Sequence, residues 1–239
     1  IGVSRRSLGD IRQAAPFVGA KGGKGGTLRS AFLVVDEVPV ASRAIDRRAA
    51  NITALCATSN RLWIACPYDG TVKVYDAGSM VRLAVWPFER AGALALSPSG
   101  ELWTLQEGDT NHPPRVVALD ERGRPGSREI RFDARAAPAA ICFAPDGRLF
   151  VADDGPRQQI LIFDNLDSAP RAAGAVGHVG GIHSGLAGAF APLKFNRPRA
   201  IACDARGMLY IAHGGSTGGG STILEAYAPD LTLLWRPFG

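Results

Sequence analysis

The sequence predicts an all-β protein assembled from repeated four-stranded units, and three observations lead to that prediction. One sequence pattern of about 15 residues, which we call the repeated phrase, occurs four times along the 239-residue chain. Each copy contains a tight polar turn between two short apolar runs. No stretch shows the sustained apolar periodicity and the end caps that predict an α-helix. Self-similarity of this kind indicates an architecture built by repeating one supersecondary unit.

The repeated phrase predicts two strands joined by a hairpin turn. A leucine followed by an aromatic residue opens the second strand of every copy. Glycine supplies the positive φ angle that a tight hairpin turn needs, and three of the turns end in glycine: Ser99-Gly100, Asp146-Gly147 and Arg206-Gly207. The leucines mark the repeat, with spacings of 40, 47 and 60 residues: Leu62, Leu102, Leu149 and Leu209.

Weaker strands follow each copy of the phrase. Their residues alternate between apolar and polar types, as expected of strands that are buried on one face. The predicted pairs are residues 70–76 with 81–86, 115–120 with 128–132, and 222–227 with 231–235, and the third unit shows one such strand at 160–164. Four strands per unit and a period of roughly 40 to 50 residues are typical of the blades of a β-propeller.

The copies divide the chain into four blades and a partial one. The predicted blades are residues 51–90, 91–137, 138–197 and 198–239, and residues 27–50 fit the last two strands of an earlier blade. The glycines of residues 1–26 lack the Gly-Lys-Ser/Thr ending of a phosphate-binding loop. Residues 1–26 are therefore predicted to be a flexible linker. Propellers close with typically four to eight blades, so the chain is either a sector of a larger ring or a small, irregular ring. We favour a sector of a larger, six-bladed ring and expect a segment of a longer polypeptide.

Composition excludes several classes of protein. Twenty-seven Lys and Arg residues against 22 Asp and Glu give a net charge of +5, but the arginines are scattered, so no nucleic-acid interface is predicted. No apolar run approaches the roughly 18 residues of a membrane span, so no membrane insertion is expected.

The four cysteines show neither a CxxC pair nor zinc-ligand spacing, and they lie among apolar residues. We therefore expect buried free thiols. A disulfide between Cys56 and Cys66 stays open, although the two residues are out of register in one hairpin. Cys142 and Cys203 occupy similar units and could lie near each other.

The last two copies carry a more specific pattern. A glycine-rich approach, Gly177-His-Val-Gly-Gly-Ile-His-Ser-Gly185, precedes Phe190, Pro192 and Phe195, a strand, an Asp-x-x-Gly turn and Leu209-Tyr-Ile-Ala-His213. Residues 138–153 match the second half of this pattern and end in Leu149-Phe-Val-Ala-Asp153. The pattern resembles the NHL-repeat family of β-propellers over residues 51–239, most sharply at 138–213. The units at 51 and 91 lack the glycine-rich approach and the closing Asp, and they are as similar to the related SMP-30/gluconolactonase group.

Loops at one end of a propeller usually carry its function. The loops after the second strands, and the long loop between the third and fourth units, contain all four histidines and a set of carboxylates. Carboxylate oxygens suit Ca²⁺, and imidazoles suit transition metals. Alternatively, Asp153 caps a turn and the histidines are exposed loop residues. The predicted ligand-binding residues are Glu107, Asp109, His112, Asp153, Asp154, His178, His183 and His213.

The loop between the third and fourth units, Ala175–Asn196, is longer than its counterparts and rich in glycine. Long loops in compact domains are often functional or mobile, so ligand contact is expected there. Arg197 and Arg199 follow it and either hold a carboxylate or phosphate or face water. No catalytic residue is assigned, because no Gly-x-Ser-x-Gly motif is present.

Two functional hypotheses follow. The first is a non-catalytic binding or scaffolding module without a cofactor, which presents one loop face to a protein, carbohydrate or small-molecule ligand. The alternative, implied by the resemblance to gluconolactonases, is a metal-dependent lactonase-type hydrolase with an ion such as Ca²⁺ in the propeller channel. The first is favoured because the ligands of that ion cannot be placed residue by residue. The richness in Ala, Arg and Gly suggests a bacterial source, and similar repeats in exported bacterial proteins suggest an extracytoplasmic, secreted location.

Overall fold

The structure is a computed structural model that describes residues 52–188, 191–214 and 222–237. The predicted linker at 1–26 and the predicted partial blade at 27–50 lie outside the described residues. Phe190 of the glycine-rich pattern and residues 215–221 of the loop after His213 also lie outside them. The expectations for these segments stay predictions.

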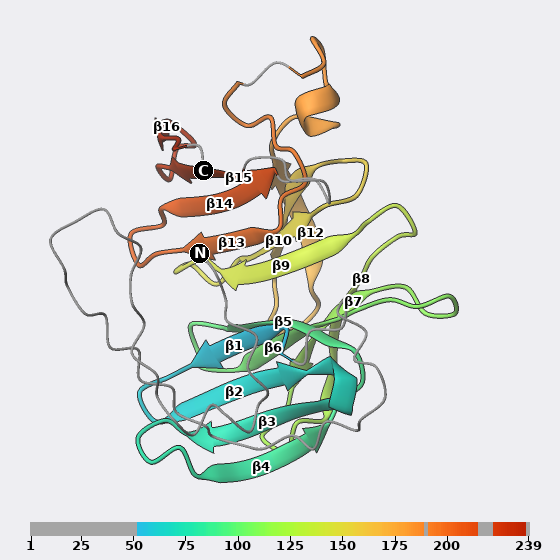
Figure 1. The fold of residues 1–239 in the computed structure, drawn as a ribbon, viewed down its shortest axis with the longest axis vertical. Coiled ribbons are helices and arrows are strands. Elements are labelled where there is room, and N and C mark those ends of the chain that lie inside the picture. Colours follow the sequence, from blue (N-terminus) through green and yellow to red (C-terminus); the bar gives the residue numbers. More distant parts are fainter. Residues whose placement is uncertain (1–51, 189–190, 215–221, 238–239) are drawn as a thin grey trace, which may run out of the picture. The chain divides into compact units, whose positions relative to one another are not determined.

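The described residues form four antiparallel sheets of four strands each, and each sheet is one blade (Figure 1). The strands of a blade follow one another in chain order. The only helical elements among the described residues are two short 3-10 turns, η2 (Pro67–Asp69) and η3 (Gly181–His183). The prediction of an all-β propeller with four-stranded antiparallel blades is therefore confirmed.

The strand bounds of blades 1 to 4 are as follows. Blade 1 consists of β1 (Ala54–Ala57), β2 (Arg61–Cys66), β3 (Thr71–Asp76) and β4 (Arg82–Pro87). Blade 2 consists of β5 (Ala91–Leu96), β6 (Leu102–Gln106), β7 (Arg115–Leu119) and β8 (Pro125–Arg131). Blade 3 consists of β9 (Pro138–Phe143), β10 (Leu149–Asp153), β11 (Gln159–Asp164) and β12 (Arg171–Val176). Blade 4 consists of β13 (Ala200–Cys203), β14 (Leu209–Gly214), β15 (Thr222–Tyr227) and β16 (Leu233–Trp235).

Strand β12 was not predicted from the sequence. Its residues are Arg-Ala-Ala-Gly-Ala-Val, and all but the last are exposed, so the alternation that reveals a half-buried strand is missing. The loop between blades 3 and 4 therefore begins at Gly177 rather than at Ala175. The other shifts are small, such as the start of β8 at Pro125 rather than Arg128.

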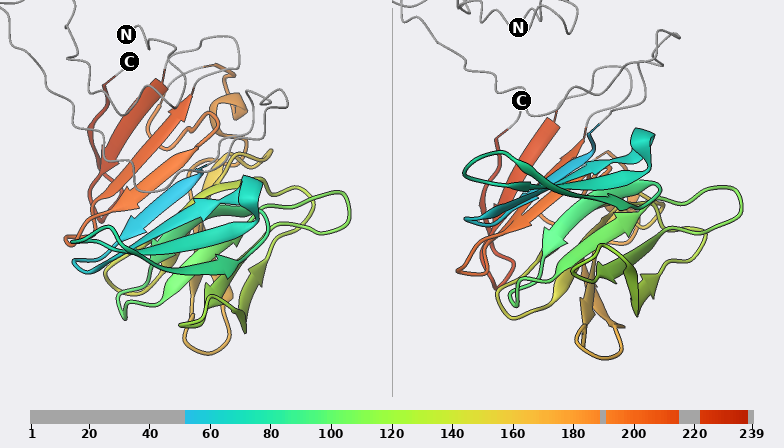
Figure 2. Two further views of the ribbon diagram at one scale, coloured as in Figure 1. Left: turned by 60° about the horizontal axis from the view of Figure 1, so that its bottom comes forward. Right: turned by 90° about the horizontal axis from the view of Figure 1, so that it is seen from below.

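The blades pack through their first strands, with β1 on β5, β5 on β9 and β9 on β13. Figure 2 shows the four sheets from two further directions. An apolar cluster fills each of the three interfaces between neighbouring blades. Among the described strands, no packing of comparable extent joins β1 to β13. This arrangement supports a sector of a ring, and the number of blades in the complete ring stays a prediction.

The Leu-aromatic phrase has a packing role that repeats in all blades. The aromatic residue of the second strand lies directly opposite a small residue of the first strand. We call these the aromatic–small pairs: Trp63 with Cys56, Trp103 with Ala95, Phe150 with Cys142, and Tyr210 with Ala202.

The hairpin turns and the cysteines have the conformation and the free-thiol state that the sequence predicts. Gly100, Gly147 and Gly207 have φ angles of 84°, 86° and 79°, the region that only glycine enters without strain. All four cysteines are free thiols, and burial raises the pKa of the Cys142 thiol to about 12. In the described part of the chain, no helix is long and apolar enough to cross a membrane.

Candidate functional site

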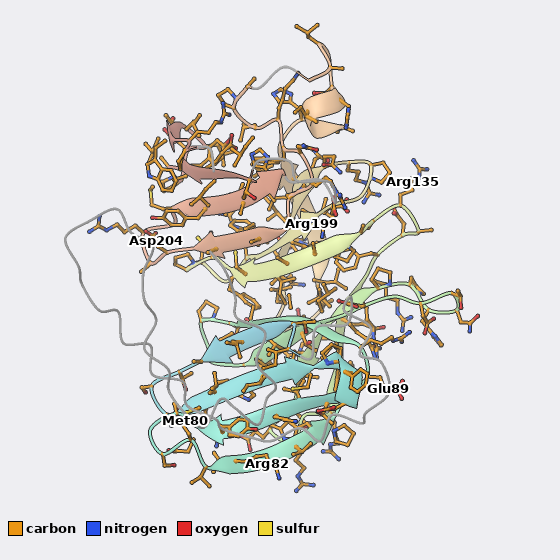
Figure 3. All side chains as sticks on the ribbon, viewed as in Figure 1. Met80, Arg82, Glu89, Arg135, Arg199 and Asp204 are labelled. Atoms are coloured by element: carbon orange, nitrogen blue, oxygen red, sulfur yellow. The ribbon has the colours of Figure 1, made fainter. Side chains whose placement is uncertain are left out.

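The order of the strands determines which loops share an end of the molecule. In an antiparallel meander, the loops after the second and fourth strands lie at one end, and the hairpin turns after the first and third strands lie at the other. Figure 3 shows Glu89, Arg135 and Arg199 near one end of the strands and Met80 and Asp204 near the other. We call the first end the loop face: residues 67–70, 88–90, 107–114, 132–137, 154–158, 177–188 and 191–199.

The predicted site residues of blade 2 form a small, internally bonded loop. The carboxylate of Asp109 accepts hydrogen bonds from the backbone N–H groups of Asn111 and His112, at 2.8 and 2.7 Å. It also contacts the His112 ring at 3.0 Å and forms an ion pair with Arg90. Glu107, which begins the loop, is exposed. This loop satisfies the Asp109 carboxylate without an added ligand.

The two neighbouring aspartates of blade 3 have different roles. Asp153 is fully buried, and its Oδ1 accepts hydrogen bonds from the N–H groups of Ala137 and Gly155, at 2.7 and 2.9 Å. This geometry matches the turn-capping alternative. Asp154 forms ion pairs with Arg197 Nε at 3.2 Å and Arg199 Nη2 at 2.8 Å. The two arginines therefore hold a carboxylate of their own chain.

His213 is buried in blade 4, within a polar cluster. Its Nδ1 accepts a hydrogen bond from the N–H of Asn196 at 3.2 Å, so its other ring nitrogen carries the proton. That nitrogen lies 3.3 Å from the carboxylate of Glu225. Glu225 is fully buried and accepts hydrogen bonds from Tyr227 Oη and Arg236 Nε, both at 2.5 Å.

The electrostatics of this cluster follow from its contacts. Burial alone raises the pKa of Glu225, but the nearby His213 ring and the hydrogen bonds from Tyr227 and the charged Arg236 bring the pKa below its ordinary value. Burial and the neighbouring carboxylate both raise the pKa of Tyr227. Glu225 is therefore ionised and Tyr227 is a neutral hydrogen-bond donor at neutral pH.

Sequence reasoning missed Glu225 and Tyr227, although a signal for Glu225 was present. Glu225 lies two residues from Ile223 and two from Tyr227, and both of these side chains are buried. Residues two apart in a strand share one face. A carboxylate between two buried residues of one face needs donors from neighbouring elements, so this alternation predicts a buried charge.

The described part of the loop between blades 3 and 4, which we call the joining segment (residues 177–188 and 191–199), is fastened at its base by buried side chains. Gln159 Nε2 donates to the carbonyl of Gly177 at 2.7 Å, and Tyr227 Oη accepts from the N–H of Leu193 at 2.9 Å. Gln158 Oε1 accepts from the N–H of Arg197. Blade 3 contributes the two glutamines and blade 4 contributes Tyr227, so both blades hold the segment.

Glycine permits the close packing of this segment. Phe195 is fully buried, with its ring 5.5 Å from His213 and 6.2 Å from Tyr227. A Cβ atom on Gly181, whose φ angle is 50°, would lie 2.0 Å from the carbonyl oxygen of Phe195. The glycine is needed at this position because the backbone passes so close to Phe195, and not because the segment must be flexible.

The outer part of the segment projects apolar side chains. Val179 and Leu186 are 71% and 78% exposed, and His178 and His183 are also exposed. Backbone hydrogen bonds hold this part in place, from His178 N–H to Leu193 carbonyl and from Gly180 N–H to Arg157 carbonyl, both at 2.8 Å. We call Val179 and Leu186 the apolar tip.

The structure does not bring the eight predicted residues to one point. They are divided among the blade 2 loop, the buried turn cap Asp153, the Asp154 ion pairs, the exposed histidines of the joining segment and the buried His213. No group of three or more His, Cys, Asp or Glu side chains that could hold a metal ion occurs among the described residues. The alternative hypothesis of an ion such as Ca²⁺ therefore gains no support from side-chain convergence in these residues, and the expected lack of a cofactor stays a prediction.

Two hollows lie at the end opposite the loop face. One of about 330 Å³ lies between blades 3 and 4, and another of about 350 Å³ lies between blades 2 and 3. Arg148 and Asp146 line both of them. Neither hollow contains a predicted site residue, and both open broadly to solvent. They do not define a ligand site.

Comparison with known proteins shows the fold. No protein-family model and no curated protein sequence matches the chain. Among solved structures, hydrazine synthase from Kuenenia stuttgartiensis is similar at 15% identity with a TM-score of 0.55, covering 85% of this chain and 53% of that chain. Virginiamycin B lyase from Staphylococcus aureus is similar at 11% identity with a TM-score of 0.52, covering 79% and 56%.

A third similar structure is the Cps50 (Swd1) β-propeller domain of Myceliophteria thermophila, at 18% identity with a TM-score of 0.52, covering 80% of this chain and 56% of that chain. The chain thus spans about half the length of the three structures. At these identities the similarity establishes the β-propeller fold and leaves the activity open.

Proposed function

We propose that the chain is a non-catalytic, NHL-like β-propeller module that binds a protein partner through its loop face. The observation that carries this proposal is the joining segment, which is fastened by buried polar side chains and yet exposes the apolar tip. The resemblance of residues 138–213 to NHL repeats supports the assignment to a binding module. The propeller fold is itself a common platform for protein interactions.

The physical argument concerns the entropy of binding. An exposed valine or leucine on a mobile loop contributes little, because ordering the loop costs about as much free energy as burial of the side chain provides. The joining segment is already ordered by hydrogen bonds from Gln158, Gln159 and Tyr227. Burial of Val179 and Leu186 against a partner then contributes to affinity without that ordering cost. Two apolar side chains on one fixed projection favour a protein surface over a sugar or a small polar ligand.

The metal-dependent hydrolase lacks a comparable observation. Two of its candidate carboxylates are already engaged within the chain: Asp109 with Arg90 and His112, and Asp154 with Arg197 and Arg199. Calorimetric titration of Ca²⁺ and then Zn²⁺ into the metal-stripped chain tests it directly. Binding tighter than micromolar, with a raised melting temperature, would reverse our preference and justify a screen of lactone substrates.

The proposal is tested with the immobilised chain and a library of displayed protein domains. Binders selected on the wild type are measured against a V179E/L186E variant and against a V81E control. Val81 is also an exposed valine, but it lies in the hairpin turn at the opposite end of blade 1. We expect binding to fall at least tenfold with V179E/L186E and to stay unchanged with V81E.

Two results would count against the proposal. One is a set of binders that tolerate both variants, because the apolar tip would then have no role. The other is a glycan array in which the chain binds sugars at the same affinity with and without the apolar tip, which would move the function to a carbohydrate ligand.

A further inference from the structure

The joining segment carries positive charge and no carboxylate. Residues 168–203 contain no Asp or Glu, although acidic and basic residues are nearly balanced in the whole chain. The cations of the joining segment are Lys194, Arg197 and Arg199. The neighbouring residues 189–190 and 215–221, which lie outside the described part of the chain, contain no charged side chain in their sequence either. Negative charge near the joining segment must therefore come from other elements.

The carboxylate that reaches the joining segment from blade 3 matches only part of this charge. Asp154 pairs with Arg197 Nε at 3.2 Å and with Arg199 Nη2 at 2.8 Å. Two guanidinium groups thus share one carboxylate, and one positive charge is left over. The Arg199 side chain is 55% exposed and that of Arg197 is 36% exposed, so the excess charge lies at the surface.

The loops next to the joining segment do not remove the excess charge. Arg157 pairs with Asp133 and lies 3.9 Å from the buried carboxylate of Asp153, so these two carboxylates are already close to a guanidinium group of their own. Arg135, in the loop that follows blade 2, adds an exposed guanidinium group. The part of the loop face around blade 3 and the joining segment therefore has a net positive charge.

Lys194 places one of these charges beside the apolar tip. Its Nζ donates hydrogen bonds to the carbonyl of Ser184 at 2.5 Å and to the carbonyl of Leu186 at 3.2 Å. Carbonyl groups hold the ammonium group in place without neutralising it, and no carboxylate of the described residues pairs with it. Leu186 is one of the two residues of the apolar tip. A fixed positive charge thus accompanies a fixed apolar side chain.

The other half of the loop face has the opposite character. Glu89 and Glu107, in the loops of blades 1 and 2, are exposed carboxylates. Figure 3 shows Glu89 on the lower blades and Arg135 and Arg199 on the upper ones. A partner that carries carboxylates is attracted by the second region and repelled by the first. This division favours one orientation of the partner on the loop face.

We propose that the joining segment recognises an acidic protein surface, on which carboxylates surround the apolar residues that cover Val179 and Leu186. This proposal rests on the proposed function, because it assigns a chemistry to the partner of the apolar tip. Opposite charges accelerate the encounter of two proteins. Burial of the apolar tip then excludes water from the contact, which strengthens the interaction of the Lys194 ammonium group with a carboxylate of the partner.

Nucleic acids and anionic lipids also attract cations, but this surface fits them less well. Single-stranded nucleic acids stack their bases on aromatic side chains, and the joining segment exposes no aromatic side chain, since Phe195 is buried. Membrane-bound segments use larger apolar areas. The side chains of Val179 and Leu186 together have about half the carbon atoms of a myristoyl chain, which by itself binds membranes only marginally. A protein partner is therefore favoured.

Fluorescence anisotropy with defined probes tests the proposal. The probe is a labelled random copolymer of Glu and Tyr, which offers both carboxylates and apolar rings. Pure poly-Glu and a copolymer of Lys and Tyr of the same length are the comparisons. We expect the chain to bind the Glu and Tyr copolymer at least tenfold more tightly than either comparison. Its affinity should fall at least fivefold when NaCl is raised from about 50 to about 300 mM, because salt screens exposed charges.

Single variants locate the charges that matter. Lys194→Gln should weaken binding of the Glu and Tyr copolymer about fivefold at low salt, and Lys194→Arg, which keeps the charge, should restore it. Since Lys194 also bonds to the backbone of the segment, Arg199→Gln is the second variant. It leaves Asp154 paired with Arg197 and should also weaken binding. Arg206→Gln removes the same charge from an exposed hairpin turn at the opposite end and should have no effect.

Several results would overturn the proposal. Binding that is insensitive to salt, to Lys194→Gln and to Arg199→Gln would show that the charges have no role. Binding to poly-Glu as tight as to the Glu and Tyr copolymer would show that the apolar tip has none. Tighter binding to phosphatidylserine vesicles, to a single-stranded oligonucleotide or to the Lys and Tyr copolymer would assign the surface to another ligand.

Failure of this proposal can be distinguished from failure of the proposed function. The domains selected on the wild-type chain are measured again at both salt concentrations and with Lys194→Gln. Loss of their affinity with V179E/L186E, together with indifference to salt and to Lys194→Gln, leaves the proposed function in place and overturns the acidic partner. Selected domains that lose affinity in all three cases support both. Circular dichroism verifies that each variant is folded.

Discussion

The interface between blades 2 and 3 differs from the interface between blades 3 and 4, although both use the same pairing of faces. The first is an apolar cluster in which Trp103 and Leu105 pack with Leu149 and Val151. The second has an apolar cluster as well, but its loop end also buries Gln158, Gln159, His213 and Glu225. Most of the buried polar residues in the described chain belong to blades 3 and 4.

This comparison shows that one set of residues holds neighbouring blades together and another set holds the loop between blades 3 and 4. Apolar side chains fill the interface between blades 2 and 3, and its polar contacts lie around them, such as the hydrogen bond from Arg128 to the Leu166 carbonyl and the ion pair of Arg157 with Asp133. The extra polar groups of blades 3 and 4 bond instead to the backbone of the joining segment, as Gln159 does to Gly177 and His213 to Asn196. Burying such groups lowers the free energy only when they are fully bonded, and the segment supplies the bonding partners.

The largest expected effect comes from breaking the apolar interface. Trp103→Ala removes a fully buried ring and should lower the free energy of unfolding by about 3 to 5 kcal/mol. Urea denaturation measures the change. Tyr68→Ala, which truncates an exposed ring on the loop face, is the matched control and should have little effect. A loss under about 1 kcal/mol for Trp103→Ala would mean that the blades dock by other contacts.

Breaking the buried charge cluster should have the next largest effect. Glu225→Gln leaves Arg236 without its ionic partner and should lower the free energy of unfolding by about 3 kcal/mol. Glu129→Gln is the control, because Glu129 pairs with Arg115 and Arg131 at the surface, where such pairs contribute about 0 to 1 kcal/mol. Equal losses for the two variants would contradict the special role of the buried cluster.

A smaller, local effect is expected in the joining segment. Gly181→Ala forces a Cβ atom against the Phe195 carbonyl and should destabilise the segment by about 1 to 3 kcal/mol. Gly185 also has a positive φ angle, but its nearest neighbour is the Lys194 ammonium at 3.9 Å, so Gly185→Ala should cost less. The rate of amide hydrogen exchange at His178 and Ile182 measures the destabilisation of the segment in both variants. Unchanged protection in Gly181→Ala would show that the segment is not held at this point.

The smallest expected effect is the pH dependence contributed by Glu225. Its pKa in the folded chain is below the ordinary value of 4.5. Its stabilising contribution is therefore complete above about pH 4.5 and is lost as the pH falls through the folded pKa. The difference in unfolding free energy between the wild type and Glu225→Gln should be constant near neutral pH and shrink in acid. If this difference in unfolding free energy grew on acidification, the pKa of Glu225 would be raised in the folded chain and not lowered.

Much of the fold was predictable because its signals are local. A Leu-aromatic pair after a tight turn identifies the first hairpin of each blade, and in the structure its aromatic residue is paired with a small residue of the preceding strand. Strand β12 lacked such a signal, because Ala and Gly side chains on an exposed edge show no alternation. Its formation depends on pairing with β11, as between Leu161 and Ala175, and the sequence of β12 by itself does not indicate that pairing.

The candidate site was predictable only in part, because its contacts are not local. The sequence drew attention to Asp154 and His213 as loop residues. The partners that decide their roles are Arg199, 45 residues away from Asp154, and Glu225, on the strand next to that of His213. Such pairs depend on how two blades dock and on the register between strands, and neither appears in a residue pattern.

The way the joining segment is fastened has a consequence for the order of folding. Its anchoring hydrogen bonds close loops of 17 to 39 residues, whereas the hairpins of each blade close much shorter ones. Loop closure costs conformational entropy, so hairpins form first, and the segment acquires its native shape only after blades 3 and 4 have docked. It should be the last part of this region to form and the first to open. A partner that recognises the ordered segment would therefore discriminate finished molecules from incompletely folded ones.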